Sequence, residues 1–213
     1  MDAPSIRPAA SAICVRDGRD GDPEVLVVER SAASRFLPGY VAFPGGAVDP
    51  ADASSAARWF GNGGEVQRAA AIRELIEEVG LALTAGGLIR SRSHQQVDQM
   101  PPTADRLVEI CHWVAPEEVP VRFDARYFAV FAGPGLEPEP DGTEVVRAWW
   151  TSPRALLAEW VAGARKLYWP TWFTVSELAA CTSVDTVIAL RFTTREPDAE
   201  EIAAMPTHVT EQG

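Results

Sequence analysis

The chain has 213 residues, of which 46% are hydrophobic and 23% are charged, so it can bury one sizeable hydrophobic core. These values are ordinary for a globular protein and disfavour collagen-like, disordered and membrane-embedded classes. A net charge of −11 repels phosphate backbones and anionic lipid surfaces, so we expect neither nucleic acid nor a membrane as a partner. The expected organisation is a single domain over residues 1–213, with a core over about 8–165 and a helical extension over about 166–205.

The three cysteines, Cys14, Cys111 and Cys181, lie far apart in the sequence and form no CxxC pair. Neither a disulfide framework nor a zinc site is therefore expected. Free thiols suit a reducing compartment, and residues 1–10 lack the basic and then apolar pattern of a signal peptide. The expected location is the cytoplasm.

The first half of the chain predicts three strands followed by a helix. Short apolar runs at residues 10–15, 24–30 and 41–43 are separated by turn-forming residues, which is typical of strands. Over residues 66–79 the apolar period changes to that of an amphipathic helix. Gly80 follows directly and predicts the C-cap of this helix.

The second half predicts three more strands and then helices. Residues 107–114, 121–131 and 144–151 are rich in β-branched and aromatic side chains, with prolines between them. Helices are expected at residues 154–165, at 175–180 behind Thr174 and at 184–190 behind Ser183, with the two hydroxyl residues as N-caps. This order of elements predicts one mixed α/β domain with a helical C-terminal part.

Three glutamates share the polar face of the helix predicted at 66–79. Glu74, Glu77 and Glu78 lie opposite the apolar stripe, and a solvated acidic face is one explanation. However, Glu77 and Glu78 lie in the last turn, where the helix dipole disfavours an acid by about 0.3–1 kcal/mol. The nearby base, Arg73, precedes Glu77 by four residues, which is the weaker orientation for such a pair. The pattern therefore favours a site for a hard divalent cation, whose charge offsets the repulsion.

The residues from Arg73 to Leu81, with the sequence RELIEEVGL, resemble the second half of the Nudix hydrolase box at every specified position. Gly46 and Asp52 resemble its first half, with two departures. Asp52 stands where the family usually has glutamate, and Arg73 follows Gly46 thirteen positions later than is usual. The additional residues are expected within 53–65, whose Gly-Asn-Gly-Gly sequence predicts a loop.

The resemblance implies a fold, a cofactor and a reaction. The fold is a Nudix-type α/β/α sandwich around a mixed β-sheet, with extra C-terminal helices. The cofactor is Mg²⁺, with Mn²⁺ as the alternative, held by the glutamates and by a main-chain carbonyl of the Gly45-Gly46 turn. The reaction is attack of water on a diphosphate, in which one carboxylate takes the proton of the water.

The resemblance also implies that Arg73 orients the glutamates by pairing with the earlier acid of the box, which is Asp52 here. Because aspartate is one methylene shorter than glutamate and the additional residues intervene, this contact is the part of the resemblance that departs most from the family. An ordinary turn residue is the alternative role for Asp52.

Upstream of the box, Arg30, Arg35, Gly39 and the Phe43-Pro-Gly-Gly46 sequence resemble the signature of coenzyme A diphosphatases within the Nudix family. This resemblance implies hydrolysis of coenzyme A or an acyl-coenzyme A to 3′,5′-ADP and the 4′-phosphopantetheine product. Arg30 and Arg35 would supply cations for a ligand that carries a 3′-phosphate as well as a diphosphate. The alternative is that both are ordinary surface arginines.

Two residues outside the box complete the candidate site. Arg126 is a further phosphate contact, and Glu144 is the candidate for an additional carboxylate, with Glu117 and Glu118 behind it. The candidate catalytic residues are Arg73, Glu74, Glu77, Glu78 and Glu144; the substrate contacts are Arg30, Arg35, Phe43, Gly46 and Arg126; and the metal ligands are Glu74, Glu77, Glu78 and Gly45.

Other functions stay open at this point. The same box would serve a Nudix enzyme that acts on ADP-ribose, NADH or a dinucleotide, because the surroundings of the box decide the substrate. A ligand sensor that hydrolyses nothing is a further alternative. In each case the partner is a small nucleotide, and a homodimer is compatible with the sequence.

Overall fold

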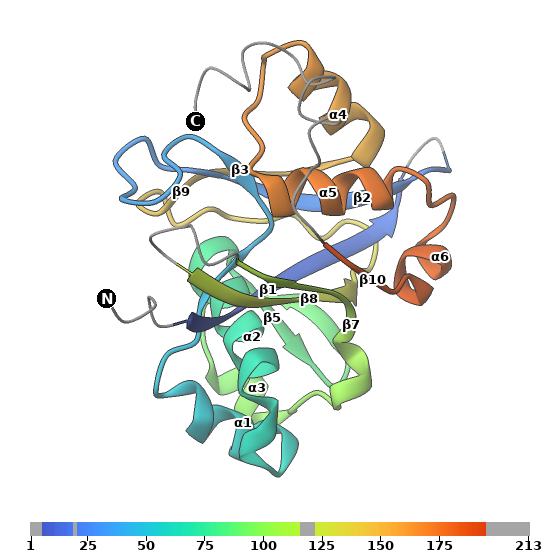
Figure 1. Cartoon of the computed structure of the whole chain (residues 1–213). Coiled ribbons are helices and arrows are strands. Elements are labelled where there is room, and N and C mark those ends of the chain that lie inside the picture. The colour runs from blue at the N-terminus through green and yellow to red at the C-terminus, as the bar shows by residue number, and fades with distance from the viewer. Residues whose placement is uncertain (1–5, 19–20, 116–121, 195–213) are drawn as a thin grey trace.

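The computed structural model describes residues 6–18, 21–115 and 122–194. One large mixed sheet forms its centre (Figure 1). Its strands are β1 (Ile6–Asp17), β2 (Pro23–Arg30), β3 (Val41–Ala42), β4 (Gly45–Ala47), β7 (Val108–Val114), β8 (Arg122–Phe131), β9 (Val145–Thr151) and β10 (Phe192–Thr193). They lie in the order β10-β7-β8-β1-β2-β3, with β4 also paired to β1 and β9 to β2.

Strand β1 organises the sheet. It pairs in parallel with β8 along almost its whole length, from Ile6 opposite Arg122 to Val15 opposite Phe131. It also pairs antiparallel with β2 and with β4. Residues 12–15 are fully buried, because both faces of this strand are covered by helices.

Helices lie on both faces of the sheet, so the α/β/α sandwich is confirmed (Figure 1). The helices are α1 (Asp52–Phe60), α2 (Val66–Val79), α3 (Gln95–Gln99), α4 (Pro153–Val161), α5 (Trp169–Leu178) and α6 (Val184–Ala189). One core lies between the sheet and α4, α5 and α6, and the other lies between the sheet and α1, α2 and α3. A separate hairpin of β5 (Leu81–Thr84) and β6 (Gly87–Arg90) follows α2. None of the helices in the described part of the chain has the length and apolar character that a membrane span needs.

Most of the additional residues expected within 53–65 are helical, since α1 occupies residues 52–60, and the predicted Gly-Asn-Gly-Gly loop forms the connection to α2. The sequence of α1 offers only a short apolar stripe, in which Ala56 and Trp59 are buried against the α2 side of the core. Asp98 accepts hydrogen bonds from Nε1 of Trp59 and Nε of Arg58, both at 2.7 Å. The helix ends at Gly61, whose φ is 76°, and this glycine is the first residue of the Gly-Asn-Gly-Gly corner.

Several other boundaries differ from the sequence-based expectation. Helix α5 begins at Trp169, so Thr174 is not an N-cap; its hydroxyl donates to the carbonyl of Pro170 at 2.7 Å within the helix. The N-cap role of Ser183 is confirmed, since its hydroxyl accepts from the amide of Thr186 at 3.2 Å. The β4, β5, β6, β10 and α3 segments were not predicted, because each is too short for a periodic pattern. The helical extension can be followed only to residue 194, and its expected end at 205 lies outside the described residues.

We expect the core beneath α2 to contribute measurably to stability, and two valines at matched positions test this. Val79 ends α2 and is fully buried, whereas Val161 ends α4 and is 60% exposed. Val79→Ala removes two buried methyl groups and leaves a cavity, which should lower the free energy of unfolding by about 2 kcal/mol. Val161→Ala should change it by less than about 0.5 kcal/mol. Urea denaturation of both variants measures the difference, and equal losses would contradict the assigned core.

Candidate functional site

The candidate site lies where the C-terminal half of α2 meets β4. Gly80 ends α2 in the left-handed conformation, with a φ of 64°, as its sequence position predicted. The carboxylate-bearing residues Glu74 and Glu78 are buried on this helix, although burial of an acid is costly unless it is paired. Glu77, in contrast, is exposed for about half of its side chain.

The guanidinium of Arg73 holds the first part of this site together. Its Nε and Nη2 donate to the two carboxylate oxygens of Asp52 at 2.9 and 3.1 Å, which is a bidentate ion pair. Nη1 donates to Glu74 at 2.8 Å and to Glu77 at 3.0 Å, and Nη2 also donates to the carbonyl of Ala47 at 2.9 Å. Asp52 is thus not merely a turn residue: it is buried at the start of α1 and pairs with Arg73.

Glu78 occupies a different position from the other two glutamates. Its Oε2 accepts a hydrogen bond from the backbone N–H of Gly45 at 2.9 Å. Burial raises the pKa of Glu78 to about 8, and the negative charges of Glu74 and Glu144 act in the same direction. Burial also raises the pKa of Glu74, against the opposing charge of Arg73. The site therefore concentrates negative charge that the described residues only partly neutralise.

The glycines of β4 allow the backbone to lie against these carboxylates. A Cβ atom on Gly46 would lie 2.3 Å from Oε1 of Glu74, which is closer than non-bonded atoms approach. A Cβ atom on Gly45 would lie 2.4 Å from the carbonyl oxygen of Ala10 on β1. Any other residue at either position would displace the carboxylate or the strand, so the two glycines form a cradle for the glutamates.

The donor set suits a hard divalent cation. The side chains at the site are carboxylates, and Mg²⁺ and Mn²⁺ prefer oxygen ligands of this kind. Within the described residues, no three His, Cys, Asp or Glu side chains already converge on a metal-binding geometry. Instead, Arg73 holds Glu74 and Glu77, and Gly45 holds Glu78. Mg²⁺ usually keeps several waters and needs only one or two protein carboxylates, so the residues fit this ion by their chemistry.

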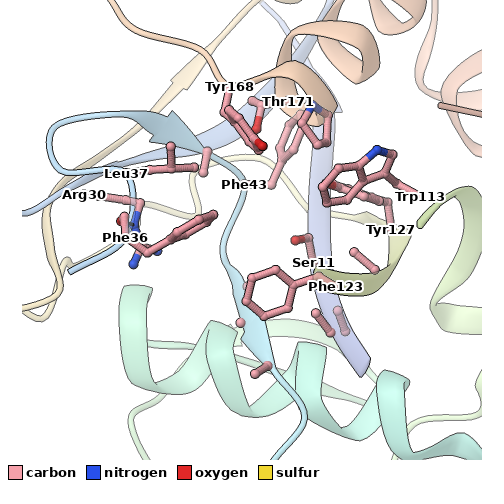
Figure 2. A pocket seen from close by; sticks show the side chains of 18 residues that line it. Ser11, Arg30, Phe36, Leu37, Phe43, Trp113, Phe123, Tyr127, Tyr168 and Thr171 are labelled. Atoms are coloured by element: carbon pink, nitrogen blue, oxygen red, sulfur yellow. Dashed lines mark hydrogen bonds between the residues drawn. The ribbon is translucent and has the colours of Figure 1, made fainter. Parts of the chain in front are cut away.

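A cavity of about 250 Å³ opens beside Gly45 and Gly46 (Figure 2). We call it the aromatic cavity, because its wall carries the rings of Phe36, Phe43, Trp113, Phe123, Tyr127 and Tyr168. In Figure 2, Phe36 and Trp113 lie on opposite sides of the space, with Tyr168 and Phe123 at its other two edges. Neighbouring rings meet at steep angles, for example 82° between Phe36 and Tyr168 and 90° between Trp113 and Tyr168.

A second, more polar hollow adjoins the aromatic cavity. We call it the arginine recess, and its wall consists of Arg30, Ala33, Ser34, Arg35, Phe36, Thr143 and Glu144. Arg30 and Phe36 belong to both walls. Arg30 also stabilises the loop that follows β2, since its Nε donates to the carbonyl of Phe36 at 3.1 Å and its Nη2 donates to the hydroxyl of Ser34 at 3.0 Å.

The predicted site residues fall into four groups. Phe43, Gly45 and Gly46 line the aromatic cavity, Arg35 and Glu144 line the arginine recess, and Arg30 lines both. Arg73 and the three glutamates line neither hollow and lie on α2 behind the Gly45-Gly46 cradle. Arg126 lines neither as well; its Nη1 donates to Glu109 at 3.0 Å. Glu117 and Glu118 lie outside the described residues.

The sequence-based prediction missed most of the aromatic wall. Trp113, Phe123 and Tyr127 come from β7 and β8, and Tyr168 comes from the segment before α5. The alternation of apolar residues along the two strands could have placed the first three on one face. Nothing local in the sequence indicates that Tyr168 reaches the same cavity, because it is brought there by the packing of α5 on the sheet.

The sequence matches one protein family and a curated relative. The model of the NUDIX domain matches residues 5–169. A Caenorhabditis elegans protein named "Putative nudix hydrolase 7" is 28% identical over 173 residues, which are 73% of this chain and 55% of that protein. The chain therefore spans about half the length of this curated relative.

Solved structures resemble the whole fold. The crystal structure of a NUDIX hydrolase from Alicyclobacillus acidocaldarius is 29% identical, with a TM-score of 0.73 over 92% of this chain and 100% of that one. The NUDIX domain of Shewanella oneidensis NrtR, solved with ADP ribose, has a TM-score of 0.53 at 11% identity, over 81% of this chain and 86% of that one. At such low identity the second likeness concerns the fold alone.

The raised pKa of Glu78 predicts how the metal-free protein responds to pH. A carboxyl whose pKa is about 8 when folded and 4.5 ordinarily binds a proton more tightly in the folded state, so stability falls as the pH rises through this window. Glu78→Gln removes the charge and keeps an oxygen to accept from Gly45. It should therefore raise the melting temperature in EDTA at pH 8.5 and change it little at pH 5.

The control for this measurement is Glu77→Gln, which alters a half-exposed side chain on the same turn. Its effect on the melting temperature should not grow with pH in the same way. If Glu78→Gln changed the melting temperature equally at both pH values, the pKa of Glu78 would not be raised.

Proposed function

Because the chain belongs to the NUDIX domain family, we propose that it hydrolyses the diphosphate bond of a nucleoside diphosphate linked to another group. Water adds to one phosphorus atom, the phosphoric anhydride bond breaks, and each half leaves with a phosphate. The arrangement of Glu74, Glu77 and Glu78 around Arg73 and the Gly45-Gly46 cradle supports this reaction.

The residues of the site take distinct parts in this proposal. Glu74, Glu77 and Glu78 hold Mg²⁺, or Mn²⁺ in its place, which when bound neutralises charge on the phosphoryl oxygens and lowers the pKa of water. Arg73 orients the carboxylates through its pair with Asp52. A carboxylate at the site accepts the proton that the attacking water loses, and Glu144 is the candidate for this role, because it lines the recess that shares Arg30 and Phe36 with the cavity beside Gly45 and Gly46.

We further propose that the substrate is coenzyme A or an acyl-coenzyme A, which yields 3′,5′-ADP and the corresponding 4′-phosphopantetheine. One observation carries this proposal: an apolar cavity beside the cradle adjoins a recess with two arginines, and the two share Arg30 and Phe36. Coenzyme A has the matching halves, a long uncharged arm and a nucleoside with an extra phosphate. Arg35 in the recess suits the 3′-phosphate, since guanidinium groups bind phosphate by charged hydrogen bonds.

The aromatic cavity suits the pantetheine arm better than a nucleobase. The planes of its neighbouring rings meet at 60° to 90°. These ring pairs therefore do not form two parallel walls between which a flat base could stack. Its wall also includes no Asn, Gln, Asp or Glu side chain that could pair with the edge of a base. Besides Arg30, its polar side-chain groups are the indole N–H of Trp113 and the hydroxyl groups of Ser11, Thr171, Tyr127 and Tyr168, which are suited in kind to the amides of the arm.

The proposed chemistry predicts a strict dependence on the metal and on the glutamates at the end of α2. EDTA should abolish hydrolysis, and Glu77→Gln and Glu78→Gln should each lower kcat by at least about 100-fold, because each removes a charge from the ion site without altering helix propensity. The control is Glu177→Gln on α5, on the other face of the sheet, which should stay within about twofold of the unaltered chain. Turnover that persists in EDTA would contradict the proposal.

The substrate assignment predicts a difference between two related substrates. Arg35→Ala should weaken kcat/KM for coenzyme A by about 10- to 100-fold, corresponding to a charged hydrogen bond of about 1.5–3 kcal/mol. Dephospho-coenzyme A lacks the 3′-phosphate, so its hydrolysis should change much less in the same variant.

Arg154→Ala provides the control. Arg154 lies on α4 and pairs with Asp22, so its substitution removes the same charge from a different surface. It should affect the two substrates equally. A preference of the unaltered chain for ADP-ribose, NADH or a dinucleotide over coenzyme A would overturn the substrate assignment and leave the hydrolysis proposal standing. Absence of turnover on every one of these substrates would favour a ligand sensor instead.

A further inference from the structure

Residues 139–144, the segment that leads into β9, are hydrogen-bonded to the C-terminal end of α2. The backbone N–H of Glu139 donates to the carbonyl of Val79 at 2.9 Å, and that of Asp141 donates to the carbonyl of Glu78 at 3.0 Å. The last carbonyls of a helix have no partner within the helix, so these two hydrogen bonds complete the end of α2. They also link the segment directly to the helical turn that carries Glu78.

Arg92 adds a second link between the same two segments. Its Nη1 donates to the carbonyl of Glu77 at 2.9 Å, and its Nη2 donates to the carbonyl of Glu139. A guanidinium at this end of a helix also interacts favourably with the helix dipole. The start of the segment is thus held to α2 by main-chain and side-chain contacts together.

The side chain of Asp141 then determines the path of the chain to Glu144. Its Oδ2 accepts from the N–H groups of Thr143 and Glu144 at 3.2 and 3.0 Å, and its Oδ1 accepts from the N–H of Val145 at 2.8 Å. The hydroxyl of Thr143 donates to the same carboxylate. Gly142 makes the turn with a φ of 78°. One carboxylate therefore orders three successive backbone amides, with that of Glu144 in the middle.

Glu144 is held on its other side by the arginine recess. Its carbonyl accepts from the N–H of Ser31 at 2.8 Å, and its side chain lines the recess next to Arg30 and Arg35. Arg30 and Phe36 of this recess also line the aromatic cavity beside Gly45, whose N–H donates to Glu78. The turn at Asp141 therefore ties the backbone of Glu144 to the end of α2.

We propose that Asp141 is a positioning residue that sets the carboxylate of Glu144 relative to Glu78 for the hydrolysis of the diphosphate. The inference rests on the proposed function and adds to it. Asp141 bridges the two groups: its main chain is bonded to the carbonyl of Glu78, and its side chain is bonded to the amide of Glu144. It acts on the reaction only through Glu144.

The experiment compares four single variants and one double variant with the unaltered chain. Asp141→Ala removes all of the amide contacts, and Asp141→Asn keeps one acceptor oxygen of the two. Glu139→Gln is the matched control, because it removes a carboxylate from the same segment. Within the described residues, this carboxylate pairs only with Arg90, and both side chains are exposed. Glu144→Gln removes the group through which Asp141 is proposed to act.

The expected results are specific to a positioning role. Asp141→Ala should lower kcat at least about 10-fold with little change in KM, Asp141→Asn should restore part of the loss, and Glu139→Gln should leave both constants within about twofold. In the Glu144→Gln background, Asp141→Ala should cause less than about a twofold further loss, because the group it positions is gone.

Amide hydrogen exchange gives a readout that does not depend on activity. In Asp141→Ala the amides of Glu144 and Val145 should exchange faster, and in Asp141→Asn at least one of these two should, whereas the amides of α2 keep their protection. Losses in kcat that multiply in the double variant, or unchanged exchange at Glu144 in Asp141→Ala, would overturn the inference while hydrolysis by the unaltered chain upholds the proposed function. Absence of hydrolysis by the unaltered chain would overturn both.

Discussion

The site depends on the five hydrogen bonds of the Arg73 guanidinium more than on any other contact. Two of them join α2 to the first residue of α1 at Asp52, one reaches the carbonyl of Ala47 on β4, and two hold Glu74 and Glu77. Because guanidinium groups are flat and always charged, a single side chain can orient groups from three elements at once. Its cation also offsets part of the repulsion among carboxylates that the end of a helix would otherwise disfavour.

The glycines of β4 and the turn at Asp141 both contact the end of α2 that carries the buried glutamates. Burial at Glu78 is tolerated because the N–H of Gly45 donates to it, and the cradle of Gly45 and Gly46 leaves no room for side chains beside Glu74. On the far side, the turn at Asp141 binds the end of α2 through main-chain groups. Each of these contacts joins segments distant in sequence, so the site exists only in the folded chain.

Sequence reasoning reached the parts of this arrangement that are local. The period of α2 and its C-cap at Gly80 are encoded within fifteen residues, and they were predicted correctly. The helix α1 was missed because its burial depends on Trp59 meeting Asp98, a partner 39 positions away. Tyr168 and the role of the Asp141 turn were missed for the same reason, since no periodic pattern announces a contact made through tertiary packing.

The corner that follows α1 has a further consequence for how the chain can be altered. Residues 61–64 are exposed, and a Cβ atom on Gly63 would meet no other atom within 4 Å. Lengthening a surface loop costs little free energy, since each doubling of its length adds only about 0.6 kcal/mol. This corner is therefore a permissive place to insert an affinity tag or attach a fluorescent dye, and because it lies between α1 and α2, such a dye would report movements of the very helices that carry Asp52 and Arg73.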